Sequence, residues 1–251
     1  MKVATWNIAG GHLLTEFVKD AAGYEKEDLD YFIGELKSLN ADIICLQEAH
    51  TSKDNQYIQG KIIADKLGYQ YVNHPYKAGE SHIKKGHFLS LSILSKYPIL
   101  KSYFRENPNP NLRSERSDGS VWITLDAGFL VAEVEYEGKQ INIANTHLVP
   151  LHYFKSNYME ARHDAIRTFI SDFLLNLNSS PSLVLGDFNF ADLKKMLPKI
   201  FSNYKQAFVQ ETTPAKGQQD HILYSNAWKL LNIEVRKVTA DHFICLAEIE
   251  L

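Results

Sequence analysis

Short apolar stretches recur along the whole chain and alternate with polar or glycine-containing segments. Their length and their content of Val, Ile, Leu and Phe predict β-strands. We expect strands at residues 3–6, 42–46, 69–72, 88–95, 129–136, 140–146, 183–185, 221–224 and 243–249. The segment Glu137-Gly138-Lys139 between two of these strands has the composition of a tight hairpin turn.

Apolar residues at a spacing of 3.6 residues predict helices between some of these strands. The longest such stripe runs from Tyr158 to Leu177, and residues 29–39 and 56–67 are also amphipathic.

The two halves of the chain share one pattern. A strand that ends at Asn7 is followed by a helix and a strand that ends at Glu48, and a strand that ends at His147 leads in the same way to Asp187 at nearly the same spacing. This similarity supports a duplicated strand–helix–strand plan, with two sheets that pack face to face and helices on the outside. No Gly/Ser linker or low-complexity segment interrupts the chain, so we expect a single domain over residues 1–251.

Polar side chains stand at the ends of the apolar strands. In the segment 182–190, Leu183 and Leu185 share one face of an extended strand with Asp187 and Asn189, so a core-facing surface continues into polar groups. The residues that share a strand face with apolar residues in the same way are Asn7, Glu48, Asn145, His147 and His242, and we expect His242 to begin the last strand. Asp220 and Asp241 stand directly before strands. Any one of them alone is typical of a turn or a satisfied core residue. Together they predict one polar site.

The chemistry of this set favours a hard divalent cation. Carboxylate and amide oxygens suit Mg²⁺ or Mn²⁺, and no Cys/His cluster has the spacing of a zinc site. Hydrolysis of a phosphoester needs a metal ion, a base for water and help for the leaving oxygen, and this set can supply all three. The sequence has no Gly-x-Ser-x-Gly motif and no glycine-rich phosphate loop.

The net charge and the lengths of the apolar stretches limit the kinds of partner that we expect. The formal net charge is −3, which argues against tight nonspecific binding of duplex nucleic acid and leaves small phosphoesters open. No apolar stretch approaches the ~20 residues that span a bilayer, and no signal peptide is recognisable, so we expect a cytoplasmic protein without a transmembrane segment. Cys45 and Cys245 lie in apolar stretches and are expected to be buried and reduced.

Six short motifs together resemble those of the endonuclease/exonuclease/phosphatase superfamily, in order and over nearly the whole chain. They are Thr5-Trp6-Asn7, Leu46-Gln47-Glu48, Asn145-Thr146-His147-Leu148, Gly186-Asp187-Phe188-Asn189, Asp220-His221-Ile222-Leu223 and Ala240-Asp241-His242. The resemblance implies an α+β fold, a four-layer α/β/β/α sandwich of two mixed, mostly antiparallel sheets as in deoxyribonuclease I. It also implies a metal-dependent phosphoric ester hydrolase.

The resemblance also implies roles for the strand-end residues. Glu48 would be the principal Mg²⁺ ligand, with Mn²⁺ as an alternative ion, and Asn7 and Asp241 would lie near the same or a second metal position. Asp187 would orient or deprotonate the attacking water, and Asn189 would donate a hydrogen bond to a phosphate oxygen.

Two histidines complete the implied catalytic set. His242, braced by Asp220, would bind the phosphate and stabilise its developing charge, because a carboxylate fixes the imidazole tautomer and favours its cation. His147 would contact the phosphate or assist the leaving group, and the neighbouring Asn145 would contribute to substrate binding.

Three classes of function stay open at the level of sequence. The first is a nuclease or DNA-end phosphodiesterase, in which the loop 107–119 would place Arg113 and Arg116 near a phosphate. The second is a phosphatase or phospholipase C-like enzyme acting on inositol phosphates or lipid head groups, and the third is a metal-free binding module on the same fold. We expect a Mg²⁺-dependent phosphodiesterase, with nucleic acid slightly favoured by analogy of fold, acting as a monomer without a protein partner.

Overall fold

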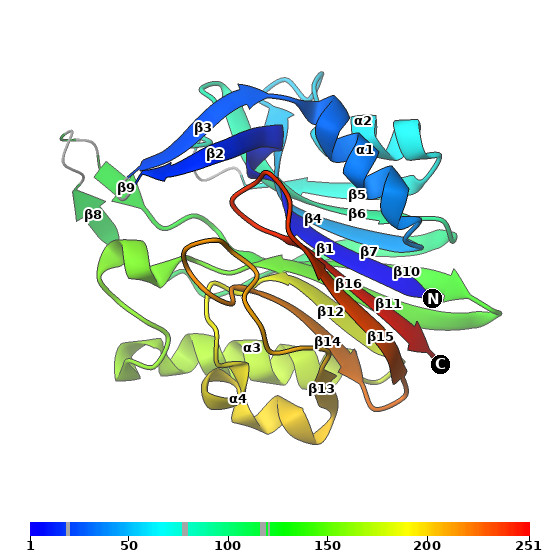
Figure 1. The fold of residues 1–251 in the computed structure, drawn as a ribbon. Helices are drawn as coiled ribbons and strands as arrows, with labels where there is room; N and C mark the ends of the chain where they lie inside the picture. Colours follow the sequence, from blue (N-terminus) through cyan, green and yellow to red (C-terminus); the bar gives the residue numbers. More distant parts are fainter. Residues whose placement is uncertain (19–20, 77–79, 116–118, 120) are drawn as a thin grey trace.

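The structure is a computed structural model that describes residues 1–18, 21–76, 80–115, 119 and 121–251. Within these residues, two six-stranded sheets pack face to face, and helices cover the outer face of each sheet (Figure 1). This is the four-layer α+β sandwich that the sequence predicts. No helix in the described ranges is both long and apolar enough to span a membrane.

The first sheet has the strand order β15-β16-β1-β4-β6-β5. Its strands are β1 (Lys2–Asn7), β4 (Ile43–Ser52), β5 (Gln70–Pro75), β6 (His87–Ser95), β15 (Lys229–Arg236) and β16 (Ile244–Glu250). Only the β1–β4 pair is parallel. Helices α1 (Leu29–Leu39) and α2 (Gln59–Leu67) cover its outer face (Figure 1).

The second sheet has the order β13-β14-β12-β11-β10-β7. Its strands are β7 (Ile99–Glu106), β10 (Gly128–Tyr136), β11 (Lys139–His147), β12 (Ser182–Asp187), β13 (Tyr204–Gln206) and β14 (Asp220–Ser225). The β11–β12 pair is parallel and the others are antiparallel. Helices α3 (Asp164–Leu177) and α4 (Leu193–Met196) lie on its outer face (Figure 1).

The central core lies between the two sheets and follows the two-residue period of the strands. Val3 and Cys45 from the first sheet pack in one buried cluster with Leu183, Leu185 and Ile222 from the second. Residues one position away face the helices instead, because successive side chains of a strand point to opposite sides. Both cysteines are buried and free, as the sequence predicts.

Two small hairpins extend from one end of the sandwich and were not predicted. They are β2 (His12–Val18) with β3 (Ala21–Glu27), and β8 (Arg113–Glu115) with β9 (Val121–Ile123). Figure 1 shows the β2–β3 hairpin reaching toward β9. Strands β7, β13 and β15 also had no predicted counterpart, and each lies at an edge of its sheet.

Three predicted boundaries were wrong. Helix α2 begins at Gln59 and not at residue 56. Helix α3 begins at Asp164, so Tyr158 and Ala161 precede it, although Tyr158 is buried as the apolar stripe suggested. His242 does not begin the last strand, because β16 starts at Ile244 and His242 lies in the preceding loop. The other strands predicted from apolar stretches are present.

Candidate active site

The parallel strand pairs bring the predicted site residues to one edge of the sandwich. Asn7 ends β1, and in the other sheet His147 ends β11 directly beside Asp187, which ends β12. Asp220 begins the antiparallel neighbour β14 and is paired with Asp187 in the same register. The carboxyl ends of the parallel strands therefore meet at the same place, and the sheets face each other there across the core.

Glu48 reaches the site because β4 is irregular at this point. Ile44 and Leu46 face the helix layer, so a regular strand would turn Glu48 the same way and not toward the second sheet. The pairing of β4 with β6 shifts register between Leu46 and Ala49, and Glu48 has a φ of 55°. Such a bulge re-aims a side chain, which corrects the simple strand-face argument made from the sequence.

Asp241 and His242 come from the loop before β16. The hydroxyl of Tyr24, in β3, donates a hydrogen bond of 2.9 Å to Oδ2 of Asp241. The indole nitrogen of Trp6 donates to the carbonyl oxygen of His242 at 3.0 Å. The loop is thus held at the site by side chains from β1 and from the β2–β3 hairpin.

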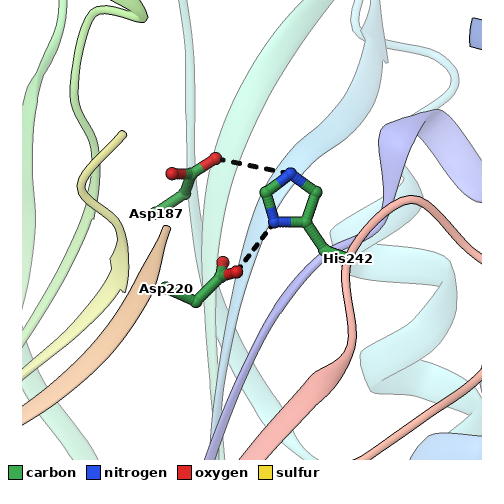
Figure 2. Close-up of side chains that lie close together, drawn as sticks. All are labelled: Asp187, Asp220 and His242. Atoms are coloured by element: carbon green, nitrogen blue, oxygen red, sulfur yellow. Dashed lines mark hydrogen bonds and ion pairs between the residues drawn. The ribbon is translucent and has the colours of Figure 1, made fainter. Parts of the chain in front are cut away.

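His242 lies between two aspartates (Figure 2). Its Nδ1 is 2.8 Å from Oδ2 of the fully buried Asp220, and its Nε2 is 3.7 Å from Oδ2 of Asp187. With Nδ1 donating to Asp220, the ring has a fixed orientation and presents Nε2 to Asp187. Asp220 and His242 are thus in contact, and their catalytic role stays a prediction.

Asp187 is the common neighbour of the site. Its Oδ2 also lies 3.7 Å from Nε2 of His147, and that nitrogen is 3.7 Å from Oε1 of Glu48. The amide nitrogen of Asn7 donates to both carboxylates, at 3.2 Å to Glu48 and 3.2 Å to Asp187. The Asn7 oxygen instead accepts from the backbone N–H of Ala9, so Asn7 orients the two carboxylates through its nitrogen.

Asn189 is tied to the same carboxylate. Its backbone N–H donates to Oδ1 of Asp187 at 2.8 Å, and its side-chain nitrogen donates to the carbonyl oxygen of Leu148 at 2.9 Å. An amide NH₂ has two hydrogens, so the second one is free to face the cavity that Asn189 lines.

Gly186 lets β12 approach β11 at this point. It has a φ of 144°, and a Cβ placed there would lie 2.0 Å from the backbone oxygen of Thr146. Only glycine fits this approach, which sets Asp187 beside His147.

The pKa values of the carboxyl groups in the site are shifted in different directions. Burial acts to raise the pKa of Glu48, but His147, His82 and the Asn7 hydrogen bond outweigh it and hold this pKa below its ordinary value. Burial raises the pKa of Asp187 despite the attraction of His242, and it also raises the pKa of Asp241, with added repulsion from Glu48. Asp187 is therefore a stronger base than an exposed aspartate.

The pKa of His242 is also raised, but by neighbouring charges and not by burial. Burial acts to lower its pKa, but the charges of Asp220 and Asp187 raise it to about 10. The ring thus carries positive charge beside the carboxylates at neutral pH.

Several carboxylate oxygens of the site have no hydrogen-bond donor. They are Oε2 of Glu48, Oδ1 of Asp220 and Oδ1 of Asp241, and all three atoms are buried. A buried anionic oxygen without a partner is costly, and hard oxygen donors of this kind are ligands for Mg²⁺ or Mn²⁺. Asp187, Asp220 and His242 also bring potential ligand atoms within 4.8 Å of one another, but a positively charged His242 ring has no lone pair to offer a metal. The donor set fits a divalent cation.

Of the three residues predicted to contact the substrate, two do not line the cavity and the third lies outside the described residues. Asn145 is fully buried and does not line the cavity. Its nitrogen donates to the carbonyl oxygens of Leu46 and Ser92, and its oxygen accepts from Gln47, so it joins the two sheets. Arg113 lies exposed in β8 and is absent from the cavity lining, and Arg116 lies outside the described residues.

A cavity of about 290 Å³ opens over the strand ends and contains residues that sequence reasoning missed. Its lining includes Glu48, His147, Asp187, Asn189, Asp241 and His242. The missed residues of the same lining include Tyr24, His82, Trp122, Tyr153 and Lys216. They come from hairpins and loops without a local pattern, so only their aromatic or basic character could have marked them.

Comparison with known proteins agrees with this fold. The family model described as the Endonuclease/Exonuclease/phosphatase family matches residues 4–242. No curated protein sequence matches the chain.

Solved structures share the whole fold at low sequence identity. An endonuclease/exonuclease/phosphatase from Beutenbergia cavernae DSM 12333 is 17% identical with a TM-score of 0.72, covering 100% of this chain and 71% of that one. The human Nocturnin catalytic domain with bound sulfate is 19% identical with a TM-score of 0.69, covering 100% and 94%. The mannosyl-6-phosphatase Bt3783 of Bacteroides thetaiotaomicron VPI-5482 is 15% identical with a TM-score of 0.65, covering 100% of both. Taken with the match of the family model over residues 4–242, the chain belongs to the endonuclease/exonuclease/phosphatase family.

Proposed function

We propose that this protein is a Mg²⁺-dependent phosphoesterase that hydrolyses a phosphodiester by in-line attack of water. One observation carries the proposal. Oδ2 of Asp187 lies 3.7 Å from Nε2 of both His147 and His242, and Glu48 and Asp241, which line the same cavity, each have a buried oxygen without a hydrogen-bond donor. The site thus combines a base, two imidazoles and a place for a cation. Because both sheets contribute, we treat residues 1–251 as one catalytic domain.

Glu48 and Asp241 would hold the cation. Bound Mg²⁺ would neutralise charge on the phosphate and polarise its oxygens. Asn7 would keep Glu48 and Asp187 in place, since its nitrogen donates to both. Asp220 and His242 are already joined at 2.8 Å, and we therefore assign this pair to the phosphate and not to the metal.

The chain's own residues would divide the remaining steps. Asp187 would accept a proton from water as the water oxygen forms a bond to phosphorus. His242 would donate from Nε2 to a phosphate oxygen, with Asn189 as a second donor, and both would stabilise the charge that develops there. As the ester P–O bond breaks, His147 would donate a proton to the leaving oxygen.

The charge of the cavity bears on the substrate class. Among its described lining residues, Lys216 is the only lysine or arginine. A long nucleic-acid backbone or an inositol polyphosphate is normally met by several cations. We therefore favour a small phosphodiester, or the end of a nucleic-acid chain, over the interior of a duplex.

Hydrolysis of two chromogenic esters tests the proposal. Bis-p-nitrophenyl phosphate and p-nitrophenyl phosphate are compared with Mg²⁺, with Mn²⁺ and with EDTA. We expect metal-dependent cleavage that prefers the diester and falls by about 10²–10⁴-fold in Glu48→Gln, because this change removes a charge that binds the cation. Glu135→Gln, at an exposed position of β10, is the matched control and should keep full activity. Equal rates for Glu48→Gln and the control would contradict the proposed metal site, and preference for the monoester would favour a phosphatase.

A further inference from the structure

Part of the cavity lining next to the strand-end residues is aromatic. It consists of Tyr24 from β3, His82 from the loop before β6, Trp122 from β9 and Tyr153 from the turn Leu151–Phe154, and we call these four residues the aromatic wall. Their rings form a continuous series, with centroids 6.3 Å apart for Tyr24 and His82, 5.6 Å for His82 and Trp122, and 5.3 Å for Trp122 and Tyr153. Four separate segments therefore contribute one ring each to the same surface.

The wall is joined to the catalytic side of the cavity. Tyr24 donates its hydroxyl hydrogen to Asp241, so one end of the wall touches a proposed metal ligand. At the other end, the ammonium group of Lys216 is hydrogen-bonded to the hydroxyl of Tyr153 and lies 4.7 Å from its ring centroid. A group attached to a phosphate at the strand ends would thus lie against these rings.

Charge argues against an anionic group on this wall. Besides the catalytic carboxylates, Glu80 and Asp126 line the cavity, and Lys216 is the one lysine or arginine among its described lining residues. A second phosphate would meet more negative than positive charge there. An uncharged group would not be repelled by this negative charge.

Some apolar and aromatic side chains of the cavity lining are exposed to solvent. Val121 is 45% exposed, Ile123 is 49% exposed and Tyr153 is 42% exposed, and all three line the cavity. Exposed apolar side chains that gather around a concave site mark a place where a ligand is covered. Aromatic rings add a preference for flat partners, because rings stack face to face or edge to face.

We propose that the aromatic wall binds a planar, uncharged ring carried by the substrate, on one of the two groups esterified to the phosphate. The inference rests on the proposed function, since it places the phosphate at the strand ends. A nucleobase on its ribose and a simple aromatic alcohol share this chemistry. An aliphatic chain does not, because it gains only from burial and not from stacking.

Two phosphonates test for stacking without turnover. Benzylphosphonate and cyclohexylmethylphosphonate differ only in whether the six-membered ring is aromatic, and their P–C bonds resist hydrolysis. Their dissociation constants are measured by calorimetry with Mg²⁺ present. We expect benzylphosphonate to bind about five- to tenfold more tightly, as ring stacking beyond plain burial would give. Equal binding, tighter binding of the cyclohexyl compound, or no binding of either would overturn the proposal.

Substitutions test whether the aromatic wall causes the preference for benzylphosphonate. Trp122→Ala should remove the difference between the two phosphonates, and Trp122→Phe should keep most of it. Tyr103→Ala is the control, because Tyr103 is an aromatic residue that is 38% exposed in β7 and does not line this cavity. A preference that survives in Trp122→Ala would also overturn the proposal.

A second pair of ligands identifies the source of the ring. AMP and ribose 5-phosphate share a phosphate and a sugar, so tighter binding of AMP would indicate a nucleobase, and equal binding with a benzylphosphonate preference would indicate a simple aromatic ester. The outcome is separate from the proposed function. If bis-p-nitrophenyl phosphate is cleaved in a metal-dependent way but the two phosphonates bind equally, only the proposed ring binding is rejected. If benzylphosphonate is preferred but no ester is cleaved, only the proposed hydrolase activity is rejected.

Discussion

Replacing Asn145 with alanine should destabilise the fold without changing substrate affinity. Its side chain makes three buried hydrogen bonds, to Leu46 at 2.8 Å, to Ser92 at 2.9 Å and from Gln47 at 2.7 Å. Leu46 is the last paired residue before the register shift that turns Glu48 into the site. The Asn145 amide therefore supplies donors to backbone oxygens where the strand ladder is interrupted.

The magnitude follows from these three bonds. Each buried group left without a partner costs about 1–3 kcal/mol, and the groups here share one site, so we expect a loss of about 3–5 kcal/mol in the free energy of unfolding. For a chain of this length, 1 kcal/mol lowers the melting temperature by roughly 2–4 °C, which gives a decrease of about 6–20 °C. Asn145→Asp should cost at least as much, because it keeps the shape but turns acceptors toward two carbonyl oxygens.

Urea unfolding followed by circular dichroism measures the stability, and the KM for bis-p-nitrophenyl phosphate is measured at a temperature where each variant is folded. Asn232→Ala, at an exposed position of the edge strand β15, is the control and should lose less than about 0.5 kcal/mol. If Asn145→Ala kept wild-type stability and raised KM, Asn145 would contact the substrate as the sequence resemblance implies, and the structural role argued here would be wrong.

Two further predictions concern stability. His221 is buried, with its ring nitrogens bonded to Phe190, Gln206 and Gln218, and burial lowers its pKa to about 4. Because this folded-state pKa lies below the unfolded value of about 6.5, stability is present above that value and falls as the pH decreases toward 4, so the protein should be about 2 kcal/mol less stable at pH 5 than at pH 7 on account of this residue. His221→Gln should reduce that pH difference in urea unfolding, and an unchanged difference would assign the acid sensitivity to other groups. Gly186→Ala should lower the melting temperature by more than 10 °C, since its Cβ would lie 2.0 Å from a backbone oxygen, whereas Gly138→Ala, with a φ of 72° but no atom within 4 Å, should cost only about 1 kcal/mol. Similar losses in the two glycine variants would show that backbone conformation and not the close approach of Thr146 is limiting.

The sequence predicts the parts of this fold that bury apolar residues on a regular period. Strands such as β12 and β16 lie inside their sheets, so their apolar residues are continuous and recognisable. Strands β7 and β15 lie at sheet edges with largely exposed side chains, and their pattern carries no such signal. The β2–β3 hairpin is a separate two-stranded unit outside both sheets, which the same argument also misses.

The sequence predicts the position of those site residues whose side-chain direction is set by the two-residue period of a strand. Asp187 and His147 lie where the two-residue period puts them. Glu48 reaches the site only through a bulge, and His242 only through a loop, so neither position follows from strand periodicity. The aromatic wall is assembled from four segments far apart in the chain, and its position depends on tertiary packing alone.

Direct binding of Mg²⁺ is the closest test of the proposed metal site at the strand ends, because it does not depend on the choice of substrate. Calorimetric titration with Mg²⁺ should show saturable binding to the wild-type protein and to Glu135→Gln, and a strong loss of binding in Glu48→Gln. Equal Mg²⁺ binding in the wild-type protein and Glu48→Gln, or no binding to either, would contradict the assignment of the strand-end carboxylates as a metal-dependent phosphoesterase site.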